Sequence, residues 1–137
     1  MVAAGLANDG VVMNPRMVDA VIGNDLSVVR SYESTEFARA TDKAVADAVT
    51  AAMVASVNTG AAQGARIDGV DVAGKTGTAE NGSNPYTLWF TGFAPADDPA
   101  VAVAVVVENG GGKGQSGSGD TIAAPIAKKV IEAVLGR

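Results

Sequence analysis

The chain has 137 residues, of which 47% are hydrophobic, and this is enough for one compact domain with a core of its own. Its formal charge is −5 and its ten Lys and Arg residues are scattered, so we expect no nucleic-acid partner. It contains neither cysteine nor histidine, which excludes thiol catalysis, His-activated serine catalysis and Cys/His zinc sites. We expect no metal and no cofactor. No apolar stretch is long enough for a membrane span, and the first residues lack the layout of a secretion signal.

The N-terminal half predicts one clear helix and little other regular structure. Residues 1–7 are typical of the end of a helix, because a strong turn signal follows them. One short strand is expected over residues 26–32. The clear helix runs from about residue 42 to residue 57, with Thr41 as its cap. Its larger apolar residues recur at every fourth position, as Val45, Val49, Met53 and Val57.

The C-terminal half predicts three strands that pair antiparallel through short turns. Residues 70–79 alternate apolar and polar side chains, as a strand with one covered face does. Residues 86–94 are apolar on both faces, which predicts a buried central strand with Trp89 and Phe90 in the core. Residues 100–108 alternate valine with alanine, so one face carries bulk while the other lets a helix approach closely.

The chain ends in a glycine-rich connection and a last helix. Residues 109–119 predict a flexible connector, and the helix follows over about residues 120–135 with Pro125 in its first turn. One apolar stripe on this helix consists of Ile122, Ile126, Val130 and Val134. No repeat or second domain is visible, so we expect a single α+β unit over residues 1–137.

The segment at the start of the first predicted strand of the C-terminal half, residues 69–76, admits two interpretations. Residues 69–76 match the phosphate-loop pattern G-x-x-x-x-G-K-[ST], which would make the chain a nucleotide binder. That loop must follow a buried strand and open a helix, because the amides at the helix N-terminus bind the phosphate. Here a polar, glycine-rich stretch precedes the motif, and residues 77–85 cannot sustain a helix. The context therefore argues against a phosphate loop.

The second interpretation is the Lys-Thr-Gly box of serine transpeptidases and β-lactamases, which lies on a strand beside the acylation site. An edge strand offers free amides and carbonyls, so a peptide-like substrate can add to it as a further strand. Gly77 would let the substrate backbone come close, since no Cβ intervenes. Strict alternation sends Lys75 to one face and Thr76 and Thr78 to the other, so a site that uses all three should lie along the edge.

Several further segments resemble class B penicillin-binding proteins, and they occur in the order in which that family has them. These segments are Ala3 to Gly10 with Asn14-Pro15, Ala73 to Glu80, Trp89 to Pro95, Val103 to Asn109, and Ala123 to Ala127. The resemblance covers essentially the whole chain, and within the family the chain is similar to the A type of the actinobacteria. It implies the C-terminal part of a transpeptidase domain. The fold would be a partial β-lactamase/transpeptidase-like fold, with a three-stranded antiparallel sheet packed against helices from both ends of the chain.

The resemblance also implies a function for the Lys-Thr-Gly strand. Lys75, Thr76, Gly77 and Thr78 would bind substrate: Lys75 would contribute positive charge, the two threonine hydroxyls would bind the substrate carboxylate, and the Thr78 N–H would serve the oxyanion hole. The parent protein would cross-link peptidoglycan stem peptides ending in D-Ala-D-Ala at the extracytoplasmic face of the bacterial cell membrane. It would also bind β-lactams.

The family's nucleophile is not visible in this sequence. No serine has a lysine three positions later, and Ser27 is followed by Arg30, which cannot act as a neutral base. Ser56-Val57-Asn58 resembles the family's Ser-x-Asn element, but it stands too close to the Lys-Thr-Gly strand, so we interpret it as a coincidence. We expect no catalytic residue in this chain and no activity without the part that carries the Ser-x-x-Lys box. The alternative is a non-catalytic structural or interaction module.

Two further expectations concern partners and acidic residues. Family topology pairs the strand at 101–107 with a strand from the missing N-terminal part, so we expect either that part or a second copy as partner. Asp97 and Asp98 stand between two prolines and are typical of a solvated turn rather than a metal site. Glu80 has no role that the sequence assigns.

Overall fold

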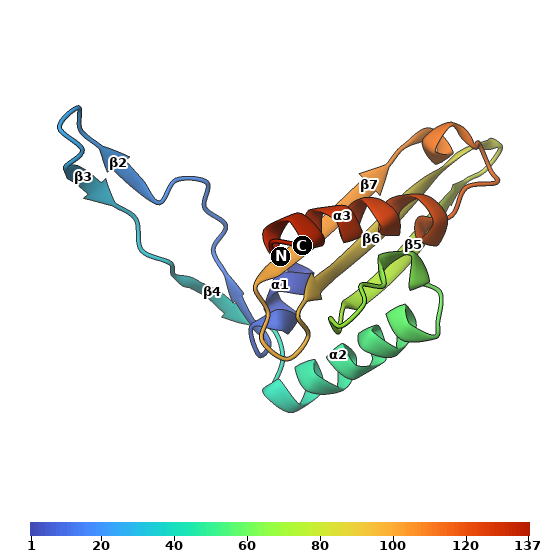
Figure 1. The fold of residues 1–137 in the computed structure, drawn as a ribbon, viewed down its shortest axis with the longest axis horizontal. Coiled ribbons are helices and arrows are strands. Elements are labelled where there is room, and N and C mark those ends of the chain that lie inside the picture. Colours follow the sequence, from blue (N-terminus) through green and yellow to red (C-terminus); the bar gives the residue numbers. More distant parts are fainter.

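A computed structural model describes all 137 residues and has a three-stranded antiparallel sheet at its centre (Figure 1). The strands are β5 (Ala73–Asn81), β6 (Asn84–Ala94) and β7 (Val101–Val107), in the spatial order β5-β6-β7. Three α-helices surround this sheet: α1 (Val2–Ala7), α2 (Lys43–Asn58) and α3 (Ala124–Val134). The α+β expectation and the antiparallel pairing are confirmed. None of the helices is both long and apolar enough to cross a lipid bilayer.

The register of the sheet follows from its short connections and its alternating side chains. β5 and β6 are joined through a tight turn that contains Gly82 at φ +64°, and Ala73 pairs with Phe93 at the far end. β6 pairs with β7 from Leu88–Val107 to Ala94–Val101. Because side chains alternate along each strand, every second residue of all three strands faces α3.

The larger core lies between the sheet and α3. Leu88, Phe90 and Ala94 of β6 are fully buried there, and the valines at 101, 103, 105 and 107 of β7 pack against the same cluster. α3 contributes Ala124, Ala127 and Ile131, all of which are 0% exposed. Alanines bring the helix axis close to the sheet, so the bulky valines of β7 can reach it.

Of the apolar stripe predicted for the last helix, only Ile122 packs against the core; the part on α3 does not. Ile126, Val130 and Val134 are 43%, 43% and 56% exposed, whereas the alanine face and Ile131 are buried. A period of four residues drifts around the helix and does not fix which side is covered. The helix also starts differently than expected, because η3 (Gly119–Ala123) is a π-helical turn and α3 begins after it, with Pro125 in its first turn as predicted.

A smaller core lies on the opposite face, where α1 and α2 meet the sheet. Ala3, Met53, Ala73 and Phe93 form it. The expectation that Trp89 is a core residue is wrong: its side chain points to this second face, beyond the cover of α1, and it is 46% exposed. Phe90 faces α3 and is fully buried, as expected.

Helix α2 runs alongside β5 rather than over one face of the sheet (Figure 1). Its Val57 belongs to the larger core and its Met53 to the smaller one, so the helix closes the side of the sheet between them. The first half of its predicted apolar stripe is not buried, because Val45 and Val49 are 51% and 37% exposed. The residue at the N-cap is Asp42 rather than Thr41, and it makes no side-chain capping bond.

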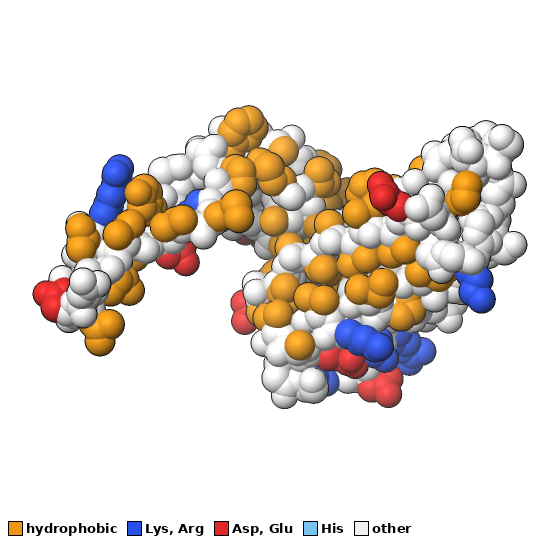
Figure 2. Space-filling model, turned by 90° about the horizontal axis from the view of Figure 1, so that it is seen from above, with side chains coloured by type: hydrophobic (Ala, Val, Ile, Leu, Met, Phe, Trp, Pro, Cys, Tyr) orange, Lys and Arg blue, Asp and Glu red, His pale blue; other side chains and the backbone are white.

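Residues 11–39 form an arm that projects away from the sheet (Figure 1). At its root β1 (Val11–Met13) pairs with β4 (Glu36–Arg39), and at its tip β2 (Ala20–Ile22) pairs with β3 (Val28–Ser31). The predicted strand at 26–32 is thus shorter, because Leu26 lies in the turn with φ +65°. Apolar side chains line the arm in Figure 2, and its tip is exposed on both faces.

The connections contain a 3₁₀ turn, η1 (Gln63–Ala65), and a turn with left-handed backbone angles at Gly110 and Gly111, η2 (Asn109–Gly112), neither of which the sequence predicted. η1 follows α2 and η2 follows β7. Ala62 and Ala65 beside η1 are fully buried in the larger core. The glycine-rich connection after β7 thus contains one defined turn, η2. Both η1 and η2 pack near the ends of the sheet.

The two faces of α3 should differ sharply in their contribution to stability. We predict that Ile131→Ala lowers the free energy of unfolding by about 2–5 kcal/mol, because it leaves a cavity in the core. Val130→Ala, one residue away on the exposed face, should lower it by less than about 1 kcal/mol. Urea denaturation followed by circular dichroism measures both, and equal losses would contradict the assignment of the faces.

Lys43 ties the start of α2 to the turn after α1. Its Nζ lies 2.8 Å from Asp9 Oδ1 and 2.9 Å from Asp47 Oδ1. The hydrogen bond with Asp9, followed by that with Asp47, raises the pKa of Lys43 above its ordinary value of 10.5. Folding therefore favours the charged form of this lysine.

This raised pKa predicts a pH dependence with a definite sign. The stabilisation that the charged Lys43 adds to the free energy of unfolding is fully present below pH 10.5. It is lost as the pH rises through the higher pKa of the folded state. Lys43→Met should therefore be less stable than the unmodified chain at neutral pH, and the difference should narrow above pH 10.5. Unfolding midpoints of the two chains across this range check it; a difference that stays constant or grows at high pH would refute it.

Candidate functional site

The Lys-Thr-Gly residues occupy the free edge of β5, at the point where α2 ceases to cover it. Ala73 and Gly74 at the start of the strand are buried, and the strand becomes accessible from Lys75 onward. β5 has β6 as its only partner strand, so its other edge carries unpaired backbone groups beyond this point. The expectation of an edge strand for this segment is confirmed.

Alternation along β5 divides the motif between the two faces of the sheet. Lys75 pairs with Thr91 and Gly77 with Trp89, on the face of the sheet opposite α3. Thr76 pairs with Phe90 and Thr78 with Leu88, whose side chains are buried under α3. Only at the edge of the strand are all four residues accessible from one side, as the sequence predicted.

Lys75 stands beside an apolar hollow along α2. Its Nζ donates a hydrogen bond to the Thr76 carbonyl oxygen at 2.7 Å, which leaves the ammonium group two further donors. The hollow has a volume of about 750 Å³. It is lined by Ala44, Val45, Ala48, Val49, Ala52 and Met53, with Ser56 and Lys75 as its polar residues. The motif lysine is thus the only charge at the edge of an apolar surface.

The two threonines make different hydrogen bonds under α3. Thr76 Oγ1 donates to the carbonyl oxygen of Ala61, in the connection after α2, at 2.9 Å. Thr78 Oγ1 instead accepts a long hydrogen bond, 3.4 Å, from the backbone N–H of Gly119 at the start of η3. Both hydroxyls therefore connect β5 to segments that are distant in sequence.

Gly119 presses against the middle of the motif strand. A Cβ atom at position 119 would lie 2.5 Å from the Trp89 carbonyl oxygen and 2.7 Å from the Gly77 carbonyl oxygen. No side chain fits at that distance, so the chain comes this close only because residue 119 is glycine. Sequence reasoning did not find this contact or the one with Ala61, because neither lies in a recognisable motif. The only signal was the alternation of glycine and serine over 116–119.

The phosphate-loop interpretation is incompatible with this geometry. Residues 73–81 form one continuous strand, and no helix begins after Lys75. The stretch before Gly69 includes the short turn η1 and an isolated bridge between Ile67 and Val70, not a buried strand. The amides that would surround a phosphate at a helix N-terminus are therefore not arranged to do so.

The remaining candidates from the sequence lie apart from one another. Asp97 and Asp98 are exposed in the turn between β6 and β7, and no three acidic residues come together as a metal site. Glu80 is exposed near the end of β5, and its side chain makes no ion pair. Ser56 does come near the motif, since it lines the same hollow as Lys75, although it belongs to the last turns of α2.

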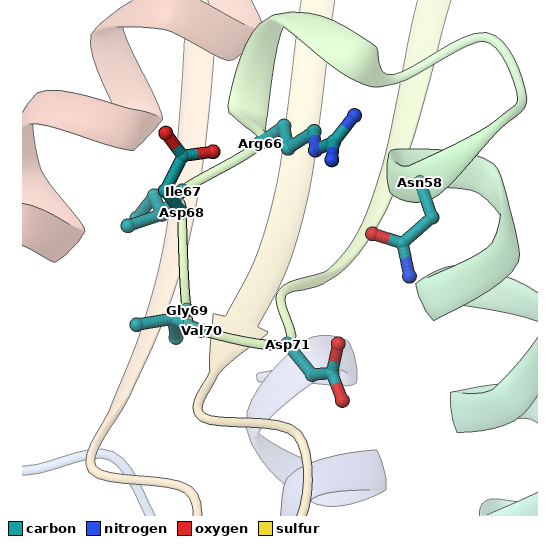
Figure 3. Close-up of a pocket in the computed structure, with 7 residues that line it drawn as sticks. All are labelled: Asn58, Arg66, Ile67, Asp68, Gly69, Val70 and Asp71. Atoms are coloured by element: carbon teal, nitrogen blue, oxygen red, sulfur yellow. The ribbon is translucent and has the colours of Figure 1, made fainter.

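A second hollow of about 330 Å³ opens near the start of β5, and Figure 3 shows the residues around it. It lies among Asn58 and residues 66–71 and contains none of the motif residues. The side chains of Arg66 and Asp71 extend to the side of the loop on which Asn58 lies (Figure 3), and both are exposed. Its charged residues form no ion pair with one another, and no nucleophilic side chain lines it, so we do not assign this hollow a function.

Comparison with known proteins gives a consistent result over the whole chain. Residues 1–132 match the family model described as the penicillin binding protein transpeptidase domain. The peptidoglycan D,D-transpeptidase PbpA of Mycolicibacterium smegmatis is 44% identical over 98% of this chain, and that of Mycobacterium tuberculosis is 42% identical over the same share. The chain spans 28% of the length of each of these relatives.

Solved structures agree with the computed fold. The ceftriaxone acyl-enzyme complex of penicillin-binding protein A from M. tuberculosis superposes with a TM-score of 0.90 at 42% identity, over 98% of this chain and 31% of that one. A D,D-transpeptidase domain from Eggerthella lenta superposes with a TM-score of 0.88 at 38% identity, over 99% of this chain and 30% of that one. The partial transpeptidase-like fold expected from the sequence is confirmed.

Proposed function

Because this chain belongs to the penicillin-binding protein transpeptidase domain family, we propose that it supplies the substrate-binding strand of a peptidoglycan D,D-transpeptidase. The observation that carries the proposal is the Lys-Thr-Gly sequence at the accessible edge of β5, with Lys75 beside an open hollow. The substrate class is a stem peptide that ends in D-Ala-D-Ala. β-Lactams would occupy the same place, and the M. tuberculosis relative forms acyl-enzyme complexes with ceftriaxone and with penicillin G.

In this proposal the peptide substrate adds to β5 as a further strand. The free backbone groups of the edge bind it in an extended form, and Gly77 leaves room for it because no side chain stands in its way. The Lys75 ammonium group attracts its terminal carboxylate, while Thr76 and Thr78 complete the binding strand. The backbone N–H of Thr78 stabilises the developing oxyanion, an interaction worth about 3 kcal/mol in acyl-transfer enzymes.

The attacking serine does not come from these 137 residues in this proposal. No Ser-x-x-Lys sequence occurs here, and the lysine of the motif has no serine of that box beside it. The hollow along α2 is where the nucleophile-bearing part of the domain would pack, since its apolar wall ends at Lys75. The complete protein would work at the extracytoplasmic face of the bacterial cell membrane, where peptidoglycan is assembled.

Covalent labelling with a fluorescent penicillin tests this division. The isolated chain should form no stable adduct, because no suitable nucleophile is present. We would replace the matching segment of M. tuberculosis penicillin-binding protein A, which is 42% identical to this chain, with this chain. The resulting chimera should be labelled. Lys75→Ala in that chimera should slow labelling at least roughly tenfold, as the loss of a charged hydrogen-bond donor predicts. Asp98→Ala is the control, since it changes an exposed charge in the turn between β6 and β7, outside the motif. Labelling of the isolated chain, or none of the chimera, would contradict the proposal.

The free edge of β7 supports the proposal that the chain has a protein partner. β7 pairs only with β6, and its sequence from Val101 to Val107 contains no charge and no proline. Figure 2 looks onto this side and shows apolar side chains gathered across the body of the molecule. An edge of this kind pairs readily with another strand. Its partner would be a strand from the rest of the domain or, for the chain alone, a second copy.

Light scattering over a range of concentrations tests the exposed edge. The chain alone should form dimers or larger species as its concentration rises. Val106→Lys should shift it toward the monomer, because Val106 is half-exposed at this edge and a charge there opposes pairing. Val45→Lys, on the equally exposed surface of α2, serves as the matched control and should leave association through β7 intact. A monomer at all concentrations would refute self-association.

A further inference from the structure

We propose that Asp120 is a positioning residue for the Thr78 N–H, the oxyanion donor of the proposed function. Its side chain fastens the start of η3 to the connection after α2, and η3 in turn holds the middle of β5 from beneath. This inference rests on the proposed function, which gives the Thr78 N–H its task. Asp120 lies outside the Lys-Thr-Gly motif and would act without touching the substrate.

The carbonyl of Gly77 and the N–H of Thr78 belong to one peptide group, whose orientation follows from the position of Gly119. A Cβ at position 119 would lie 2.7 Å from the Gly77 carbonyl oxygen and 2.5 Å from that of Trp89, the paired residue of β6. A single point this close to both oxygens lies where the two strands face each other, so the Gly77 carbonyl points toward β6. In a trans peptide group the N–H points opposite to the carbonyl. The Thr78 N–H therefore points to the open edge, where the proposed function needs it.

Gly119 supports this peptide group from the face that α3 covers. A Cβ there would also lie 3.1 Å from the Gly77 nitrogen, and the Gly119 N–H donates a hydrogen bond of 3.4 Å to Thr78 Oγ1. Residue 119 therefore lies against both of the residues that this peptide bond joins. Glycine has no side chain with which to fix its own place, so the position of the support depends on the residues beside it.

Asp120 connects this support to the other segment that contacts β5 from beneath. Its Oδ1 accepts a part-buried hydrogen bond of 2.7 Å from the N–H of Gly64. The backbones meet there as well, because a Cβ at position 64 would lie 2.2 Å from the Asp120 carbonyl oxygen. The connection that carries Gly64 is itself bonded to β5, through Thr76 Oγ1 and the Ala61 carbonyl oxygen. Asp120 thus closes a frame beneath the strand, and its carboxylate is a stronger acceptor for this purpose than a neutral group.

The start of the helix offers two simpler roles for Asp120, and neither accounts for its bond with Gly64. Capping is already provided by Ser118, whose Oγ accepts the N–H of Thr121 at 3.2 Å. A negative charge in the first turn also favours a helix through its dipole, but that effect needs a charge and no partner. Asp120→Asn separates the roles, because an amide oxygen still accepts from the Gly64 N–H although the charge is gone.

The test measures the carbonyl stretching frequency of the acyl-enzyme that the chimera described above forms with penicillin G, isotope-labelled at its β-lactam carbonyl carbon. Donors of an oxyanion hole polarise this carbonyl and lower its frequency, which infrared difference spectroscopy records. We expect Asp120→Ala to raise the frequency and to slow acylation roughly tenfold, while the affinity for penicillin G before acylation changes less than about twofold. Asp120→Asn should keep the frequency and the rate of the unmodified chimera. Gly64→Ala, on the other side of the bond, should resemble Asp120→Ala.

Amide exchange in the isolated chain follows the same hydrogen bond without any chemistry. Asp120→Ala should speed exchange of the Gly64 N–H at least roughly tenfold and should shift the amide resonances of Gly77 and Thr78, whereas Asp120→Asn should do neither. Asp98→Ala is the matched control, since it removes an acidic side chain from an exposed turn and should leave both measurements unchanged. Two-dimensional NMR reads both quantities.

The outcomes separate this inference from the proposed function. An unmodified chimera that is never acylated overturns the proposed function, and the oxyanion role of the Thr78 N–H with it. A chimera that is acylated but has the same carbonyl frequency in Asp120→Ala as in the unmodified form overturns the role of Asp120 alone. Equal effects of Asp120→Asn and Asp120→Ala would trace the effect to the charge at the helix start, and unchanged exchange at Gly64 would exclude the frame beneath β5.

Discussion

The position of β5 between two covered surfaces and one open edge is the constraint on which the site depends. α2 closes the first two residues of the strand, α3 and the turns η1 and η3 lie beneath its threonines, and β6 takes one set of its backbone groups. What remains free is a short length of edge that begins at Lys75. In the proposed function, a substrate would bind to a strand that its neighbours hold in place on every side except the open edge, which would lower the entropic cost of binding.

This constraint is built largely from small residues. Gly74 and Gly92 pair across β5 and β6 where Phe90 crosses beneath them, and a Cβ at position 74 would lie 2.6 Å from the Phe90 ring. Ala124 and Ala127 bring α3 down onto the same side. Because three backbones approach one another closely, the core has little space for larger side chains. A substitution that adds volume beneath the motif should therefore shift the backbone of β5 at its open edge.

Much of the fold could be predicted from the sequence because its signals are local. Alternation identified β5 and β7, a run of residues that is apolar on both faces identified β6, and the short turns between the strands indicated antiparallel pairing. It was harder to predict which face of each helix or strand is buried, because that depends on the other elements that pack against it. Ile126 and Val130 were in the obvious apolar stripe of α3, yet the alanines beside them pack on the sheet. Trp89 is a large aromatic residue of the kind that cores usually contain, but its side chain is 46% exposed.

The part of the candidate site that could be predicted is the part with a local sequence signal. Lys75 to Thr78 could be identified from a motif and its place on an edge strand, whereas Ala61 and Gly119 could not. They reach Thr76 and Thr78 through contacts of 15 and 41 residues in sequence separation, and a carbonyl or an N–H carries no side-chain signature. The hydrogen bonds that distinguish the two hydroxyls therefore appear only when the chain is folded.

The tip of the arm should unfold locally without unfolding of the rest of the molecule. Its root is joined to the sheet region through β1 and β4, while β2 and β3 at its tip contact neither core. A ribbon of two strands has little stability of its own in water. Its tip can therefore separate and re-form many times while the rest of the molecule stays folded, so amide exchange there would report a local equilibrium and not the global one.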